Sequence, residues 1–358
     1  MAAHTVPDQG SRMPRMSKSS RAALLAAGVC GATLVALPAM ASAATTDVQV
    51  GDMNAKLGAD MTAYYPSRIV VHKGDSVKFV FRGFHTATFL KNGTKMPPFI
   101  APTGATNPPT NDAAGAPFWW GGSTPELGVN PRLAAPTAAT AVTGRTFVNS
   151  GLPQGPNASF TVRFPKVGTF VVRCAPHPAM RAVVKVVPPK AHIPSARSVA
   201  AQVAREKAAD RATARRLARR TAPPDTVLIG PGTRRVWLMG FLPATKSVKA
   251  GATLTFRMAG RTENHTVSFG PSSVLDALAA SPEPPAQTIF PSDPPPAGPP
   301  AVTATAHGDG FVNSGVLADP GTGSPLPKRF TVRFPEAGTY SYICLLHPQM
   351  KGAITVTP

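Results

Sequence analysis

The sequence has few cysteines and few acidic residues, and these two shortages narrow its chemistry and its partners. Only three cysteines occur among 358 residues. Acidic residues number 17 against 37 Lys and Arg, which gives a formal net charge of +20. This excess of positive charge favours acidic docking surfaces on partner proteins, or association with an anionic cell surface. No nucleic-acid-binding motif accompanies the charge, so we expect no nucleic-acid partner.

An apolar run near the N-terminus is typical of a secretory signal. Four basic residues precede the run 22–37, and Ala41-Ser42-Ala43 fits an A-x-A cleavage site. The run is short for a membrane-spanning helix. We therefore predict a signal peptide over residues 1–43 and no stable membrane span after its cleavage. The expected location is extracytoplasmic, which means secreted, periplasmic or held in the cell envelope.

Beyond this signal, the chain contains the same landmarks twice and in the same order. They include FVNSG at 147–151 and 311–315, FTVRFP at 160–165 and 330–335, and a histidine followed by threonine in FHTATF (84–89) and NHTVSF (264–269). Ordered recurrence of this kind indicates a tandem duplication of one domain. We predict domain 1 over residues 44–188 and domain 2 over residues 225–358.

Both halves are predicted to be all-β. Their short alternating runs are separated by Gly and Pro turns, and long helical periodicity is absent inside either half. The segments 91–146 and 271–310 are dense in Pro, Gly and Ala, and we expect irregular loops there. Phe118, Trp119 and Trp120 are interpreted as packing for the first of these loops. Covering a functional site or contacting a partner is the alternative.

The linker between the halves, residues 189–224, is predicted to contain a helix. Its segment 195–220 is rich in Ala and Arg and is bounded by Pro194 and by Pro223-Pro224. Eight basic and two acidic residues give this segment a charge of +6. We interpret it as a solvated helical spacer. A docking surface for an acidic partner is the alternative.

Each half contains one loop with a cysteine, a histidine and a methionine at equal spacing. The loops read CAPHPAM at 174–180 and CLLHPQM at 344–350. A strand period of two places Cys174 on the apolar face of TFVVRC, and Met180 begins the apolar face of the next strand. The second loop has the same parity, so each motif is predicted to cap the end of a β-sandwich core. Two cysteines would ordinarily suggest a disulfide, but their equivalent places in the two halves argue against one.

A thiolate, two imidazoles and one weak thioether form the donor set of a blue copper site. Each half offers this set when one upstream histidine is included. The predicted copper ligands are His85, Cys174, His177 and Met180 in domain 1, and His265, Cys344, His347 and Met350 in domain 2. Soft sulfur suits Cu(I) and imidazole serves Cu(II), so a mixed set favours electron transfer with little rearrangement. Zinc sites prefer several Cys or His ligands and have no use for Met.

The segment CAPHPAMRA (174–182) resembles the copper-binding loop of amicyanin and, more broadly, of the plastocyanin-like cupredoxins. The resemblance covers most of both halves, but neither the linker helix nor the two long loops. It implies Greek-key β-sandwiches, two type 1 copper sites per chain and the role of a one-electron carrier. The family often has Asn after the first ligand histidine, where this chain has Thr86 and Thr266. We hypothesise that these hydroxyls tie the two ligand loops together. The step from that histidine to the cysteine is also longer than the family norm.

Residues beside the two cysteines argue against an enzyme. Copper oxidases and reductases connect a blue site to further copper through a histidine adjacent to the cysteine, and they use His-x-His pairs. Here the flanking residues are Arg173, Ala175, Ile343 and Leu345, and no His-x-His occurs. The remaining histidines of the mature chain are interpreted as surface residues: His72, His192 and His307. We predict a non-enzymatic carrier of single electrons between redox partner proteins. The alternative is a copper-binding or copper-delivery protein of the cell envelope.

Overall fold

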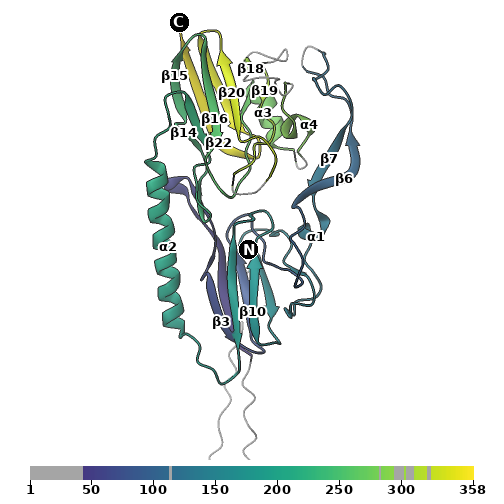
Figure 1. Cartoon of the computed structure of the whole chain (residues 1–358), viewed down its shortest axis with the longest axis vertical. Helices are drawn as coiled ribbons and strands as arrows, with labels where there is room; N and C mark the ends of the chain where they lie inside the picture. The colour runs from purple at the N-terminus through teal and green to yellow at the C-terminus, as the bar shows by residue number, and fades with distance from the viewer. Residues whose placement is uncertain (1–42, 113–114, 282–283, 294–301, 304–309, 321–323) are drawn as a thin grey trace, which may run out of the picture. The chain divides into compact units, whose positions relative to one another are not determined.

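The computed structural model describes residues 43–112, 115–281, 284–293, 302–303, 310–320 and 324–358 (Figure 1). Ala43–Pro358 forms one compact unit. The predicted signal peptide lies outside the described residues except for Ala43. Among the helices that are described, none is both long enough and apolar enough to cross a membrane.

Two five-stranded sheets form a β-sandwich from the first half of the chain. Their strand orders are β13-β2-β1-β4-β9 and β3-β11-β10-β5-β8. The strands from this half are β1 (Thr45–Asn54), β2 (Ala59–Tyr65), β3 (Arg68–His72), β4 (Ser76–Phe81), β5 (Thr88–Phe89), β8 (Val148–Asn149), β9 (Ser159–Arg163), β10 (Gly168–Arg173) and β11 (Arg181–Val187). A short 3₁₀ helix, η1 (Ala55–Leu57), joins β1 to β2. The pairs β1–β4 and β3–β11 are parallel, and the other pairs are antiparallel.

A second sandwich is formed by the second half and has the same core pairings. Its sheets have the orders β14-β12-β16-β20-β18 and β15-β22-β21-β17-β19. The strands are β12 (Thr226–Ile229), β14 (Phe241–Leu242), β15 (Thr245–Lys249), β16 (Ala252–Met258), β17 (Ser268–Phe269), β18 (Val302–Thr303), β19 (Val312–Asn313), β20 (Arg329–Phe334), β21 (Gly338–Cys344) and β22 (His347–Thr357). The predicted all-β class, with two sandwiches and a helix between them, is confirmed. The predicted residue limits of the domains stay a prediction.

Alternation along the strands builds the two cores. In β4 every second residue is buried, and β11, β16 and β20 follow the same pattern. Side chains of both sheets then meet inside each sandwich, because successive residues of a strand point to opposite faces. Cys174 and Met180 belong to the first core, and Cys344 and Met350 to the second. The predicted parity of the two loops is therefore confirmed.

One strand of the second half completes a sheet of the first sandwich. β13 (Val236–Leu238) pairs antiparallel with β2, and the register places Trp237 opposite Asp60. A small apolar cluster at this junction contains Met61 and Tyr65 from β2, Val236 from β13, and Ala214 from the linker helix. The two sandwiches are thus joined by backbone hydrogen bonds and by a shared apolar cluster.

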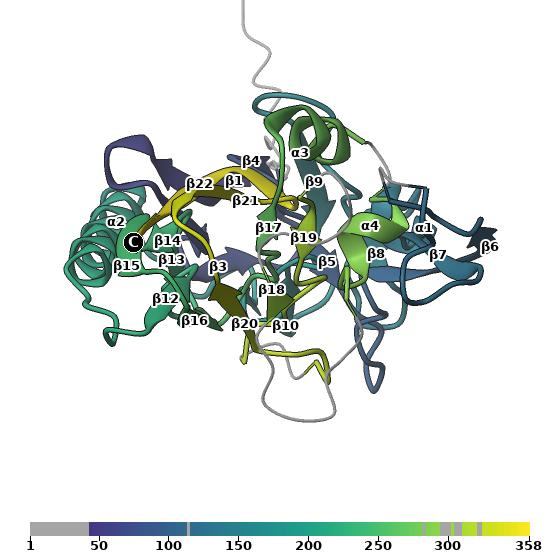
Figure 2. The same ribbon diagram turned by 90° about the horizontal axis from the view of Figure 1, so that it is seen from above.

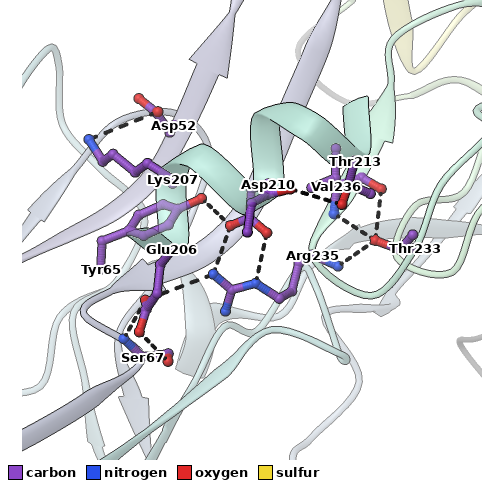
Figure 3. Close-up of polar contacts among 12 residues, drawn as sticks. Asp52, Tyr65, Ser67, Glu206, Lys207, Asp210, Thr213, Thr233, Arg235 and Val236 are labelled. Atoms are coloured by element: carbon purple, nitrogen blue, oxygen red, sulfur yellow. Dashed lines mark hydrogen bonds and ion pairs between the residues drawn. The ribbon is translucent and has the colours of Figure 1, made fainter. Parts of the chain in front are cut away.

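The linker helix is α2 (Ala196–Ala218), and Ser195 caps its N-terminus by accepting the N–H of Ser198 at 3.2 Å. Its helical structure was predicted correctly, but the interpretation as a solvated spacer is wrong. Asp210 is only 5% exposed. Its carboxylate accepts the hydroxyl of Tyr65 at 2.6 Å and pairs with the Arg235 guanidinium at 2.7 Å (Figure 3). The helix therefore fastens a strand of the first sandwich to the chain entering the second.

The two long segments contain more regular structure than expected. In the first, β6 (Ile100–Asn107) and β7 (Thr124–Val129) form an antiparallel ribbon, followed by α1 (Pro131–Ala134). In the second lie α3 (Ser272–Ala279) and α4 (Ala286–Ile289). Most residues of β6 are exposed. A strand that buries neither face needs no alternation of apolar and polar residues, so the sequence does not indicate the ribbon. Figures 1 and 2 show the ribbon and α2 on opposite sides of the sandwiches.

The aromatic group in the first long segment packs against the second sandwich. Phe118 is 4% exposed and shares an apolar cluster with Ile343 and Leu345, the residues that flank Cys344. The indole N–H of Trp119 donates to the carbonyl of Pro291 at 2.7 Å. These residues therefore do more than pack their own loop, because they cover the end of the other sandwich beside its cysteine.

Candidate metal centres

Three predicted ligands of the first sandwich converge on one point. His85 precedes β5, while Cys174 and His177 lie in the loop between β10 and β11. Nδ1 of His85 lies 3.0 Å from Nδ1 of His177. Sγ of Cys174 lies 3.2 Å from Nδ1 of His177 and 3.9 Å from Nδ1 of His85. The exposed fractions of His85, Cys174 and His177 are 0%, 1% and 5%, so the donors are shielded from water.

The second sandwich brings together the equivalent three residues. Sγ of Cys344, at the end of β21, lies 3.7 Å from Nδ1 of His265 and 3.7 Å from Nδ1 of His347. In each of the two groups the donor atoms all lie within 4.8 Å of one another. The upstream histidines, which are 89 and 79 residues from their cysteines, thus reach the sites despite the long intervening segments.

The two predicted thioether ligands lie in the same cores as the cysteines. Met180 and Met350 are 1% and 0% exposed. In the first loop the N–H of Cys174 donates to the carbonyl of Met180 at 3.1 Å, so the chain returns beside the cysteine. Met180 and Met350 as metal ligands stay a prediction. The two cysteines are buried in separate sandwiches and form no disulfide with each other.

The threonine after each upstream histidine ties the two ligand loops together. The N–H of Thr86 donates to Sγ of Cys174 at 3.3 Å, and its hydroxyl oxygen accepts the N–H of Ala175 at 2.8 Å. Thr266 makes the same two contacts in the second sandwich, at the same distances. The hypothesis that a hydroxyl replaces the usual asparagine in this place is consistent with these contacts.

The asparagine of each FVNSG motif is connected by hydrogen bonds to the same ligand loops. Asn149 is fully buried, and its Nδ2 donates to the backbone carbonyls of Arg132, Leu133 and Ala135. Its Oδ1 accepts the hydroxyl of Thr88 at 2.8 Å, and that hydroxyl lies 3.1 Å from the hydroxyl of Thr86. Asn313 has the corresponding bonds in the second sandwich, with Ser268 in place of Thr88. A polar chain therefore runs from this motif to each cysteine loop.

Two glycines that the sequence reasoning missed make room for the upstream histidines. A Cβ added to Gly51 would lie only 2.3 Å from Nε2 of His85, and one added to Gly230 would lie 2.4 Å from Nε2 of His265. Both glycines have positive φ, 79° and 51°, which side chains other than glycine rarely adopt. Their signal in the sequence was a glycine directly after the first apolar run of each half, in VQVG and VLIG.

Burial keeps His85 in the form that binds metals. Because the ring is desolvated and lies near His177, the pKa of His85 falls well below its usual value. A neutral imidazole with its proton on one nitrogen keeps a lone pair on the other. Nε2 of His85 is buried and has no hydrogen-bond partner among the described residues, while Nδ1 faces the cysteine sulfur.

Charge also collects around the other ligand histidines. Burial acts to lower the pKa of His177, but the charges of Glu263 and Cys174 outweigh it and raise that pKa well above its usual value. Glu263, a residue that the sequence reasoning missed, lies 2.6 Å from Nε2 of His177. The sequence feature that could have identified Glu263 is that it is the only acidic residue between Asp225 and Asp276. Burial raises the pKa of the neighbouring Asp60 to about 6.

The histidines predicted to have no metal role lie outside both groups. Nε2 of His72 is 2.9 Å from the carbonyl oxygen of Ala191, and its Nδ1 is 3.7 Å from Asp75. His192 is exposed. His307 lies outside the described residues.

The chemistry of each group matches one class of metal. One sulfur and two imidazole nitrogens, buried beside a methionine in an apolar core, are the donors of a type 1 copper site. The two groups therefore fit two type 1 copper sites, one in each sandwich. Together with the two sandwiches, they agree with the cupredoxin resemblance of the cysteine loops.

No protein family model and no curated protein matches the chain. Among the solved structures that match it is a reduced Cu(I) form of an amicyanin mutant, with 18% identity, coverage of 39% of this chain and 89% of that chain, and a TM-score of 0.23. A purple cupredoxin from Nitrosopumilus maritimus matches with 17% identity, coverage of 37% and 98%, and a TM-score of 0.21. An auracyanin from the photosynthetic bacterium Roseiflexus castenholzii matches with 17% identity, coverage of 37% and 95%, and a TM-score of 0.24. Each of these likenesses covers well under half of this chain.

Proposed function

We propose that the chain is an exported, two-domain blue copper protein that carries single electrons between protein partners. The observation that carries the proposal is the convergence of one thiol and two imidazoles at a buried point in each sandwich. The residues that would hold copper are His85, Cys174, His177 and Met180 in one domain, and His265, Cys344, His347 and Met350 in the other. Copper bound there would supply one-electron chemistry between its Cu(I) and Cu(II) states.

The surrounding residues hold the donors in place. Thr86 and Thr266 bond to the cysteine sulfur and to the following loop, so the sulfur and the upstream histidine move together. Ligands fixed by packing and by outer hydrogen bonds need little rearrangement when the charge of a site changes. The apolar cores around Cys174 and Cys344 also exclude water from the sulfur.

The residues next to the cysteines favour a carrier over an enzyme. Neither cysteine has a histidine neighbour in the sequence, so the adjacent-histidine relay by which copper oxidases and reductases pass electrons to a catalytic copper is absent. Copper delivery is disfavoured by burial, because a protein that hands over its metal needs accessible donors. Cys174 and Cys344 are 1% and 0% exposed.

The positive charge of the chain supports redox partners with acidic docking surfaces, and association with an anionic cell surface. We propose cleavage of residues 1–43 during export and domain limits of 44–188 and 225–358, with the linker between them. The N-terminal basic residues and the apolar run support the export step.

The test is to express residues 44–358, load copper, and measure metal content together with optical and EPR spectra. Two coppers per chain with an intense thiolate band would support the proposal. A colourless protein that binds only zinc would overturn it. Carrier and delivery roles are separated by comparing electron exchange with copper loss to a Cu(I) chelator, since a carrier keeps its copper through many redox cycles.

A further inference from the structure

One carboxylate lies between the two candidate copper sites. Glu263 belongs to the loop between β16 and β17 of the second sandwich. Its Oε1 lies 2.6 Å from Nε2 of His177 in the first sandwich, and its Oε2 lies 3.8 Å from Nε2 of His347 in the second. Nδ1 of each of these rings faces a cysteine sulfur. Each imidazole therefore turns one nitrogen to its own site and the other to the shared carboxylate.

The contact is enclosed where the two sandwiches are joined. The side chain of Glu263 is 12% exposed and that of His177 is 6% exposed. Trp237, whose strand β13 pairs with β2 of the first sandwich, places its ring 5.2 Å from the ring of His347. A buried carboxylate needs a polar or charged partner, because desolvation without one is costly, and the His177 imidazole at 2.6 Å is that partner.

Only one of the two halves provides this residue. Glu263 stands two positions before His265, and the equivalent place before His85 is Gly83. A Cβ added to Gly83, whose φ is 120°, would lie 3.3 Å from Nε2 of His85. A side chain at position 83 would therefore strain the backbone and crowd the His85 ring, and a single carboxylate, Glu263, lies near both sites.

We propose that Glu263 is a positioning residue shared by the two candidate copper sites and that it forms the link along which an electron passes between them. This rests on the proposed function. A carboxylate on the outer nitrogen of a ligand histidine fixes its tautomer and ring orientation. The same carboxylate lies 2.6 Å from Nε2 of His177 and 3.8 Å from Nε2 of His347, so a change in its position or charge reaches both rings.

The link is short and needs no further reactant. It consists of the His177 ring, the Glu263 carboxylate and the His347 ring, with gaps of 2.6 and 3.8 Å. One site loses one electron and is oxidised, and the other site gains that electron and is reduced. No bond forms or breaks, and the Nε2 protons stay on the rings.

The first experiment tests positioning without metal. Metal-free residues 44–358 are compared with the variants Glu263→Ala and Glu263→Gln by ¹⁵N NMR of the histidine rings. Glu206→Gln is the matched control, because Glu206 also joins elements across the molecule, through Ser67, without contacting a ligand histidine. Both Glu263 variants are expected to shift the ring signals of His177 and His347 together, and the control neither. A shift in only one ring, or in none, would overturn shared positioning.

The second experiment tests the electron link in the copper-loaded protein. A short pulse of reductant delivers less than one electron per chain, and rapid-freeze EPR follows its redistribution between the sites. Cys174→Ser and Cys344→Ser proteins supply the reference spectrum of each remaining site. The redistribution rate is expected to fall at least tenfold in Glu263→Ala, less in Glu263→Gln, and not at all in Glu206→Gln. Rates within a factor of two of the parent protein in both Glu263 variants would overturn the link.

The two proposals fail in different ways. If the parent protein binds no copper or shows no thiolate band, the proposed function is wrong, and the metal-free NMR comparison still decides whether Glu263 positions both rings. If the parent is blue with two coppers but the Glu263 variants behave like it, the carrier function stands and the link is wrong.

Discussion

The two candidate copper sites have the same donors but different surroundings at the sulfur. In the first loop the only backbone N–H that donates to Cys174 Sγ within the described chain comes from Thr86, and Pro176 has no N–H to offer. In the second loop Leu346 stands in the place of Pro176, and its backbone amide bonds to Cys344 in addition to the N–H of Thr266.

These donors have an electrostatic consequence. Burial acts to raise the pKa of Cys344, but the hydrogen bond and charge of His265 and the two backbone amides outweigh it and lower that pKa. Donors that stabilise negative charge on sulfur also stabilise the reduced, more electron-rich state of a site. Glu263 lies closer to His177 than to His347, so its negative charge opposes reduction of the first site more strongly. Two sites with the same ligands in the same fold can therefore have different reduction potentials.

Removal of one sulfur at a time should have the largest effect on this comparison. Cys174→Ser and Cys344→Ser are each expected to remove one type 1 copper and about half of the thiolate absorbance, because each sandwich holds its own site. Copper content and the optical spectrum measure the outcome. Loss of both sites from either single variant would show that the two sites are not separate.

Replacing the glycine that contacts each upstream histidine by alanine should weaken copper binding at that site and leave the other site unchanged. Gly51→Ala and Gly230→Ala are expected to displace His85 and His265, to lower copper affinity at that site at least tenfold, and to destabilise the fold by on the order of 3 kcal/mol. Copper titration and thermal unfolding measure both effects. Gly58→Ala is the control, since Gly58 also has positive φ, 53°, but nothing lies within 4 Å of an added Cβ. If this control lost as much affinity as Gly51→Ala, contact with the ring would not be the cause.

Deletion of the buried asparagine should weaken one sandwich through its loops. Asn149→Ala and Asn313→Ala each leave three backbone carbonyls without a donor, with an expected loss of about 3 kcal/mol in the free energy of unfolding. Chemical denaturation measures this loss. Asn107→Ala is the control, because Asn107 lies on the β6–β7 ribbon and its side chain makes only long contacts of 3.4 and 3.5 Å. Equal losses in all three variants would contradict the supporting role.

The smallest expected effect comes from a change at the sulfur of Cys344, and it tests the difference between the two reduction potentials directly. Leu346→Pro removes one N–H from the sulfur of Cys344, so the reduction potential of the second site is expected to fall towards that of the first. Spectroelectrochemistry of the copper-loaded protein measures both potentials. The first site is the internal control and should stay unchanged. A second-site potential that does not move, or that rises, would contradict the assigned role of the backbone amide.

Much of the fold and of the candidate sites could be predicted because the information is local. A strand period of two placed Cys174 and Met180 on the apolar side, and both are buried in the first core. The helix over 195–220 was predictable from composition, and α2 covers most of it. The ribbon β6–β7 was not predictable, because its strands are stabilised by pairing with each other and bury little apolar surface.

The contacts between the halves were not predictable, because they join residues far apart in the sequence. Nothing around Asp210 indicates that Tyr65 and Arg235 will surround it, and the helix therefore looked like a solvated spacer. The aromatic residue Phe118 likewise gave no sign that it packs beside Leu345 of the other sandwich.

The donor types, their spacing within each cysteine loop and the strand parity that places the sulfur in an apolar core all follow from the sequence alone. These are properties of a few consecutive residues and of the strand period. The sequence named His85 and His265 as candidates, but tertiary packing was needed to bring them to the cysteines, to leave room for their rings at two glycines, and to place Glu263 between His177 and His347. The reason is physical: such contacts depend on how separate strands and loops pack in space, and the distance between two residues along the chain does not fix the distance between their atoms.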